Sequence, residues 1–207
     1  MYRMMISKIP YFVRRLFSGC FEFGVPCEGK MIYLTFDDGP VPEVTPKVLE
    51  LLDRYNAKAT FFCVGDNIRK HPDCFEEVIS HGHAVGNHTM HHLQGMTTTC
   101  KKYMNDVEQC NALCRSKLFR PPYGRPTVKQ IRELRKQGYR IILWTVISYD
   151  YNRKLSPEKC LRNVSNLHSG DIVLFHDSIK AEKNMFYCLE NVLKTYSEKG
   201  FEFRALE

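Results

Sequence analysis

Two short segments of the sequence carry side chains that can bind a metal ion. Asp37 and Asp38 follow the apolar run MIYLTF and precede a Gly-Pro turn, while His88 and His92 lie four residues apart in NHTMHH. A helical turn would place these two imidazoles on one side, and His91, one turn from His88, is an alternative partner. Aspartate is common in turns and a lone histidine is usually structural. Three histidines within five residues nevertheless indicate a site for zinc or a similar divalent ion, for which imidazole is the usual nitrogen ligand.

The chemistry expected of such a site is hydrolysis. Adjacent aspartates at the end of a strand point in different directions, so one can bind the ion while the other faces a substrate. Two histidines and one aspartate leave a coordination position open for water, as in catalytic zinc sites. A bound cation lowers the pKa of that water to about 7. Asp37, His176 and the turn at Tyr123 are candidates for the base, the acid and the oxyanion group that the reaction also needs.

The elements that must position these groups alternate along the chain. We expect strands at 31–36, 59–64, 83–86, 118–120, 139–144, 171–175 and 201–204, with helices between them, among them 72–80, 97–116, 127–137 and 183–199. This alternation predicts a single α/β domain with a largely parallel sheet of about seven strands, closed or nearly closed into a barrel. Chemistry in such folds gathers at the carboxyl ends of strands. Titratable residues follow the predicted strands in succession: Asp37, Asp38, His88, Arg120, Asp150 and His176.

Composition limits the class of protein. The 207 residues are 43% hydrophobic and 26% charged, which is typical of a globular domain. No apolar run approaches the roughly 20 residues of a spanning helix. The net charge is +7, but the basic residues are spread along the chain and no nucleic-acid-binding motif is present. The nine cysteines are odd in number and lack a C-x-x-C pair, which favours a reducing compartment and therefore the cytoplasm.

The first 27 residues are expected to be an N-terminal extension that packs on a catalytic domain comprising residues 28–207. Their apolar run is too short for a signal-peptide core, and two arginines interrupt it. The stretch is amphipathic and basic, so peripheral contact with an anionic membrane is the alternative to packing. Oligomeric state leaves no signal in the sequence.

Five local patterns together resemble the polysaccharide deacetylases of carbohydrate esterase family 4, the NodB-homology domain. They are TFDDGP at 35–40, HTMHH at 88–92, RPPYG at 120–124, WTVISYDY at 144–151 and IVLFH at 172–176. They occur in the family's order and span nearly the whole chain. The resemblance implies a distorted (β/α) barrel and an enzyme that removes acetyl groups from N-acetylated sugars.

The resemblance also implies a role for each matching residue. Asp38, His88 and His92 would bind the metal, which we expect to be zinc, with cobalt, nickel and manganese as alternatives. Four residues would carry the catalysis: Asp37 as base, Arg120 as its partner, His176 as acid and Asp150 as support for the acid. The Tyr123 backbone N–H would stabilise the oxyanion, and Leu174 and Tyr151 would line the acetyl pocket.

Two positions depart from the family pattern. Ile147 stands where the family often has Asp, and Tyr151 where it often has Trp. These departures bear on the substrate more than on the reaction. Two other functions remain open: an amidase or esterase acting on a non-sugar substrate, and a metal- or glycan-binding module without catalysis. Asp37, Arg120 and His176 argue against the latter, because binding alone needs neither base nor acid.

Overall fold

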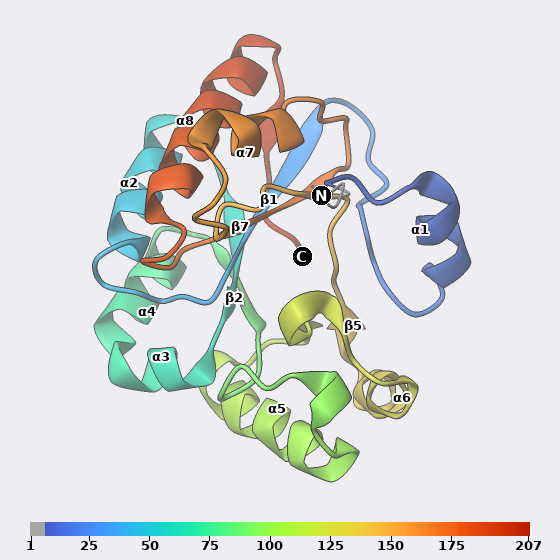
Figure 1. The fold of residues 1–207 in the computed structure, drawn as a ribbon. Helices are drawn as coiled ribbons and strands as arrows, with labels where there is room; N and C mark the ends of the chain where they lie inside the picture. Colours follow the sequence, from blue (N-terminus) through green and yellow to red (C-terminus); the bar gives the residue numbers. More distant parts are fainter. Residues whose placement is uncertain (1–6) are drawn as a thin grey trace.

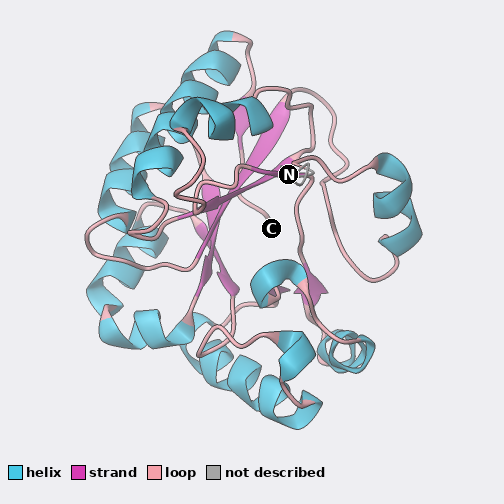
Figure 2. Cartoon of the chain, in the orientation of Figure 1, coloured by secondary structure: helices cyan, strands magenta, loops and turns pink. Residues whose placement is uncertain are grey.

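A computed structural model describes residues 7–207 of the chain. Its centre is a sheet of parallel strands in the order β5-β4-β3-β2-β1-β7-β6, with β8 paired to β1. The strands are β1 (Met31–Asp37), β2 (Ala59–Cys63), β3 (Ala84–Asn87), β4 (Leu118–Phe119), β5 (Arg140–Ile141), β6 (Val146–Ile147), β7 (Ile172–His176) and β8 (Glu202–Phe203). In Figure 2 the strands cross the middle of the molecule and most helices lie to one side of them.

Helices alternate with strands along most of the chain, as the sequence predicted, although α1 precedes the first strand and no helix separates β5 from β6. The helices are α1 (Tyr11–Phe17), α2 (Thr45–Arg54), α3 (Gly65–Lys70), α4 (Pro72–Ser80), α5 (Cys100–Cys114), α6 (Val128–Lys136), α7 (Pro157–Asn163) and α8 (Glu182–Glu198), with 3₁₀ turns at Gly95–Thr97 and Pro122–Gly124. Figure 1 shows α1 apart from the others, on the far side of the sheet from α2 and α8. No helix in residues 7–207 combines the length and apolar character needed to cross a bilayer.

The sheet curls into an incompletely closed barrel. Its two end strands, β5 and β6, belong to one extended segment of the chain. At the start of that segment Ile142 N–H donates to Phe119 O of β4, and further on Thr145 N–H donates to Ile172 O of β7. The expected strand at 139–144 is therefore wrong in its extent, because the segment changes partners along its length. The distorted (β/α) barrel of about seven strands is confirmed.

The N-terminal segment lies along the same extended segment. Glu22 N–H donates to Ile141 O at 2.9 Å, and Ile9 N–H donates to Thr145 O at 2.9 Å. Residues 1–6 of the predicted extension lie outside the described residues. The boundary at residue 28 stays a prediction.

Aromatic packing between the central strands fixes the positions of their carboxyl ends. The Phe36 ring of β1 stacks on Phe61 of β2 at 4.9 Å and on Phe175 of β7 at 5.8 Å, between ring centroids. All three side chains are buried. Since Asp37 pairs in register with His176 across β1 and β7, this packing places an acidic and a basic side chain next to each other where the strands end.

Candidate active site

The three predicted metal ligands meet at the carboxyl end of the sheet. One donor atom from each of Asp38, His88 and His92 lies within 4.8 Å of the others. The distance from His92 Nε2 to Asp38 Oδ1 is 3.4 Å, and that from His88 Nε2 to the same oxygen is 4.0 Å. Asp38 follows β1 directly and His88 follows β3. The donor set is one that fits zinc and similar divalent cations.

A hydrogen bond from its other ring nitrogen fixes the orientation of His88. Its Nδ1 lies 2.7 Å from the carbonyl oxygen of Arg120, which can only accept a hydrogen bond. The proton must therefore be on Nδ1, and the lone pair of Nε2 faces Asp38. Burial lowers the pKa of His88 to about 4, so the imidazole is neutral at physiological pH. Both features suit a metal ligand.

The segment after β3 is a loop rather than the helical turn that the four-residue spacing suggested. Thr89 and His92 have φ values of 63° and 51°, in the left-handed region. The side chain of Asn87 accepts from Thr89 N–H, and Thr89 Oγ1 accepts from Leu93 N–H. These bonds fold the loop so that His92 returns to His88, with ring centroids 5.0 Å apart. The structure therefore brings the two imidazoles together through a loop, and not through the helical turn that we expected.

His91 is not part of this group. Its Nδ1 lies 2.6 Å from Asp106 Oδ1, and its backbone N–H donates to the other oxygen of the same carboxylate. Asp106 belongs to α5, so the imidazole of His91 is turned toward that helix. The alternative pair of His88 and His91 is therefore wrong.

Asp37 is a buried carboxylate held by a buried cation. The Arg120 guanidinium donates from Nη1 to Asp37 Oδ1 at 2.8 Å, and both side chains are almost fully buried. The other oxygen, Oδ2, lies 3.7 Å from His88 Nε2 and so faces the metal ligands. Burial, the largest single effect, would raise the pKa of Asp37, but the charge of Arg120, the two nearby histidines and the Arg120 hydrogen bond together outweigh it, so the pKa is lowered. Asp37 is therefore ionised and has one oxygen free of Arg120.

His176 is held in its protonated form, whereas Asp37 is held in its deprotonated form. Its Nδ1 lies 2.8 Å from Asp150 Oδ1, and its backbone N–H donates to Asp150 Oδ2 at 2.8 Å. Burial lowers the pKa of His176, but the charge and hydrogen bond of Asp150, together with the charges of Asp38 and Asp37, outweigh this and raise the pKa to about 9. The imidazole is therefore protonated at neutral pH, and Nε2–H is the group left to donate.

These residues surround one cavity of about 470 Å³. Of the predicted site residues, Arg120 and Asp150 lie behind its wall, while these eight line it: Asp37, Asp38, His88, His92, Tyr123, Tyr151, Leu174 and His176. The Tyr123 ring contacts His92 edge-on at 4.8 Å, and the Tyr151 ring contacts His176 in the same way at 4.8 Å. Leu174 is buried on β7. The structure thus brings the predicted set together.

Sequence reasoning missed several residues that line the cavity. Trp144 is only partly buried and forms part of the wall, together with Arg125, Tyr149 and Lys180. Trp144 ends the predicted strand at 139–144, so the rule that strand ends carry function would have found it. Arg125, Tyr149 and Lys180 lie in loops and gave no such signal.

Asp177, directly after His176, is a further buried carboxyl group near the site. Its Oδ1 accepts from Gly39 N–H at 2.9 Å, and its Oδ2 accepts from the Thr45 hydroxyl at 2.7 Å. A Cβ at residue 39 would overlap the carboxylate of Asp177, so this close approach favours glycine. Asp177 thereby joins the loop after Asp38 to the strand end that carries His176. Its only sequence signal was the position after His176.

The chain is similar to several known proteins. The family model for polysaccharide deacetylases matches residues 24–142. A peptidoglycan-N-acetylglucosamine deacetylase of Bacillus cereus is 34% identical over 194 residues, which cover 90% of this chain and 91% of that protein. A peptidoglycan-N-acetylmuramic acid deacetylase of Bacillus subtilis is 27% identical, over 86% of this chain and 70% of that protein. The crystal structure of a peptidoglycan N-acetylglucosamine deacetylase superimposes with a TM-score of 0.85 at 28% identity, covering 96% of this chain and 95% of that one.

Proposed function

This chain belongs to the polysaccharide deacetylase family of hydrolases, and we propose that it hydrolyses the N-acetyl group of acetylated amino sugars in an oligo- or polysaccharide. The observation that carries the proposal is the pair of opposed charge states on one cavity. Asp37 is held ionised by Arg120, while His176 is held protonated by Asp150. A base and an acid on either side of a candidate metal site are what amide hydrolysis requires.

Asp38, His88 and His92 would hold a divalent cation, which when bound polarises the acetyl carbonyl and lowers the pKa of water. Asp37 Oδ2 accepts the proton of the attacking water, whose oxygen forms the new bond to the acetyl carbon. His176 Nε2–H donates a proton to the sugar nitrogen as the carbon–nitrogen bond breaks. The products are acetate and a free amine, so atoms and protons balance. The Tyr123 backbone N–H would stabilise the tetrahedral oxyanion.

The cavity wall suits a sugar substrate. Trp144, Tyr149 and Tyr151 present aromatic surface on it, while Leu174 and Tyr151 would contact the acetyl methyl group. The relatives named above are deacetylases of peptidoglycan sugars. We therefore propose the N-acetylglucosamine or N-acetylmuramic acid units of peptidoglycan as the substrate. Zinc is the proposed cation, with cobalt, nickel and manganese as alternatives.

Release of acetate tests this function directly. The purified chain is treated with a chelator, dialysed, and assayed with each of the four metals on chitooligosaccharides, on peptidoglycan fragments and on acetylated non-sugar amides and esters. We expect no release without metal, restored release with metal, and a preference for sugar substrates. Release from the non-sugar panel alone would favour an amidase or esterase. Absence of release from every substrate with metal present would contradict catalysis.

The pH dependence of the rate tests the role of Asp150. Because His176 must be protonated to donate, the rate of the wild type falls as pH rises through the pKa of His176. Asp150→Asn removes the charge that raises this pKa and leaves the burial that lowers it. We expect the alkaline limb of kcat/KM to move to lower pH by about one unit or more. A bound cation would lower the pKa in both proteins alike, so the difference between them is the quantity to measure.

The control for this experiment is Asp171→Asn. This carboxylate is also buried, but it lies just before β7, at the end of the strand opposite to His176, where it pairs with Lys8. Its pH profile should match that of the wild type. An alkaline limb that Asp150→Asn leaves in place would show that His176 is not the acid that this limb reports.

A further inference from the structure

Helix α1 presents apolar side chains to the outside of the molecule. None of its seven residues is buried, and Phe12 and Leu16 are 71% and 75% exposed. These two lie one helical turn apart and therefore share a face. Tyr11, 68% exposed, and Arg15 flank that face from the neighbouring row. Exposure of several large apolar side chains on one short helix indicates an interaction surface.

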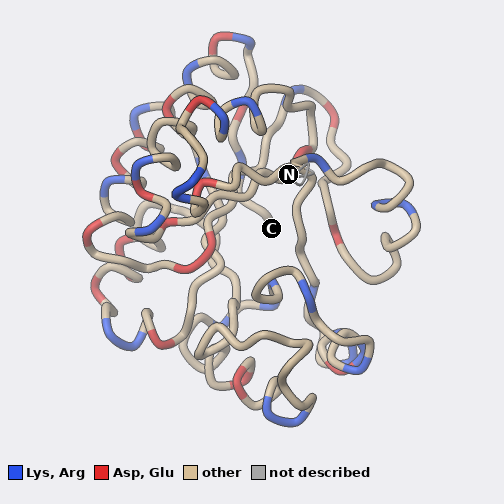
Figure 3. The backbone as a smooth tube through the Cα atoms, in the orientation of Figure 1, with Lys and Arg blue, Asp and Glu red and all other residues tan. Residues whose placement is uncertain are grey.

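The charges on α1 are exclusively positive. Its sequence, YFVRRLF, has two arginines and no acidic residue, and Figure 3 shows Lys and Arg but no Asp or Glu along this helix. Each of the other seven helices of residues 7–207 contains at least one Asp or Glu. In residues 7–207 neither Arg14 nor Arg15 forms an ion pair with a carboxylate, and the buried Nε of Arg14 has no hydrogen-bond partner.

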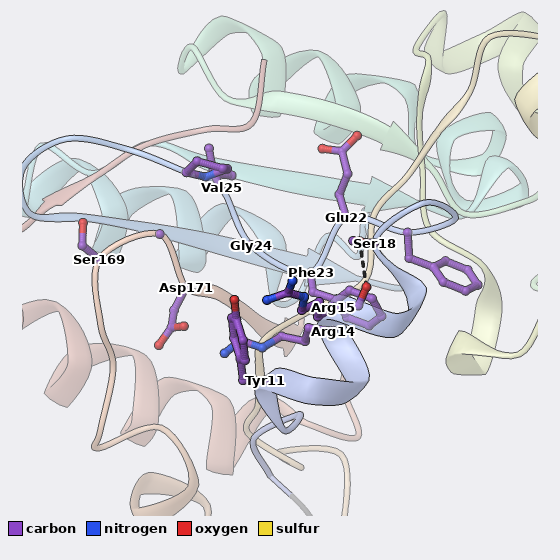
Figure 4. A pocket seen from close by; sticks show the side chains of 13 residues that line it. Tyr11, Arg14, Arg15, Ser18, Glu22, Phe23, Gly24, Val25, Ser169 and Asp171 are labelled. Carbon is purple, nitrogen blue, oxygen red and sulfur yellow. Dashed lines mark hydrogen bonds between the residues drawn. The ribbon is translucent and has the colours of Figure 1, made fainter.

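Next to α1 lies a hollow of about 510 Å³, separate from the catalytic cavity. Figure 4 shows Tyr11, Arg14 and Arg15 on its helical side and Asp171 across from them. The two carboxylates on its wall are already neutralised, since Glu22 pairs with Arg140 at 2.7 Å and Asp171 with Lys8 at 3.1 Å. The two arginines are consequently the uncompensated charges of this hollow, and an anionic group is the ligand that they fit.

We propose that α1 is a docking helix for an anionic phospholipid bilayer. Phe12 and Leu16 enter the boundary between headgroups and acyl chains, where Tyr11 sits at the level of the headgroups. Arg15, in the row next to this face, binds a lipid phosphate, while Arg14, on the opposite side of the helix, lines the hollow and adds positive charge that attracts an anionic surface. Apolar side chains on one face of a helix and arginines on the remaining faces are the pattern of helices that lie in the membrane interface. The contact is reversible, because one short helix buries few side chains.

Vesicle sedimentation with the full chain tests the proposal. The probes are sucrose-loaded vesicles of phosphatidylcholine alone and of phosphatidylcholine with phosphatidylglycerol. We expect binding to the anionic vesicles, weaker binding to the neutral ones, and loss of binding as salt is raised. Phe12→Ser combined with Leu16→Ser should weaken the affinity by about tenfold or more. Arg14→Gln combined with Arg15→Gln should remove the preference for anionic vesicles.

The matched control is Met96→Ser combined with Val128→Ser, which removes two equally exposed apolar side chains far from α1 in the sequence. It should bind vesicles as the wild type does, and both double variants should keep wild-type circular dichroism. Equal binding to neutral and anionic vesicles, or binding that the Phe12 and Leu16 variant retains, would overturn the proposal. So would a wild-type dimer in solution that this variant converts to monomer, since α1 would then be covered by a second copy of the chain.

Discussion

Replacing Arg120 with Met is expected to lower the free energy of unfolding by about 3–5 kcal/mol. The guanidinium is completely buried and uses its donors on four groups. Nη1 donates to Asp37 Oδ1 and to Thr35 Oγ1. Nε donates to Ile142 O, and Nη2 donates to Leu143 O. Methionine has similar length but donates to none of them. The variant would therefore leave a buried carboxylate without its counter-charge and two carbonyl oxygens without these donors.

Urea unfolding followed by circular dichroism measures this effect. Arg140→Met is the matched control, because it removes an Arg–Glu pair that is partly exposed, and it should cost less than about 1 kcal/mol. A double variant, Arg120→Met with Asp37→Leu, should recover part of the loss, since no unpaired charge then remains buried. A single Arg120→Met variant as stable as Arg140→Met would show that the buried pair does not hold the barrel end together.

Arg120 also illustrates how far the sequence can predict the site. The motif RPPYG indicated a partner for Asp37, and the structure has that contact at 2.8 Å. Nothing in the local sequence indicated that the same side chain lies over the Phe62 ring, 4.1 Å from its centroid, or that its own carbonyl oxygen orients His88. Those contacts join segments more than 30 residues apart, and only the folded sheet, in which β2, β3 and β4 are neighbours, brings them together.

The fold was predictable where one local pattern dominates. The strand at Met31–Asp37 and the helix at Pro72–Ser80 match the apolar run and the proline and glycine signals that predicted them. Helix α3 was not predicted, because its six residues are too few to show a helical periodicity of apolar side chains. It contains one i,i+4 ion pair, between Lys70 and Asp66. For the loop that carries His92 we expected a helical turn. The four-residue spacing does not reveal that Thr89 and His92 adopt left-handed backbone conformations.

The charge states at the site could not be predicted from residue types. Two aspartates, Asp37 and Asp150, have opposite tasks: one keeps its own charge beside Arg120, and the other keeps a proton on His176. The difference arises from which cation each carboxylate touches in the folded chain. The proposed function therefore depends on pairs of residues. The family resemblance implied both pairs, whereas residue types and spacing alone did not.

Replacing Asp37 with Asn should reduce kcat/KM for acetate release by about 10²–10⁴-fold, the usual contribution of a general base. The amide oxygen can still accept from Arg120, so the fold should persist. The amide cannot take a proton from water, and Oδ2 is the atom of Asp37 that faces the metal ligands. Metal content, measured on the same sample, should remain at the wild-type level, whereas His92→Ala should lower it.

The control for Asp37→Asn is Asp106→Asn, which alters another buried aspartate, one that contacts His91 outside the cavity. Its kcat/KM, expressed per folded molecule, should stay within about threefold of the wild type, because this carboxylate touches no group that reacts. Loss of metal from the Asp37→Asn protein would reassign Asp37 to metal binding. Acetate release by that protein within tenfold of wild type, with metal retained, would show that another group takes the proton, and the opposed pairs around the cavity would then have to be explained by stability alone.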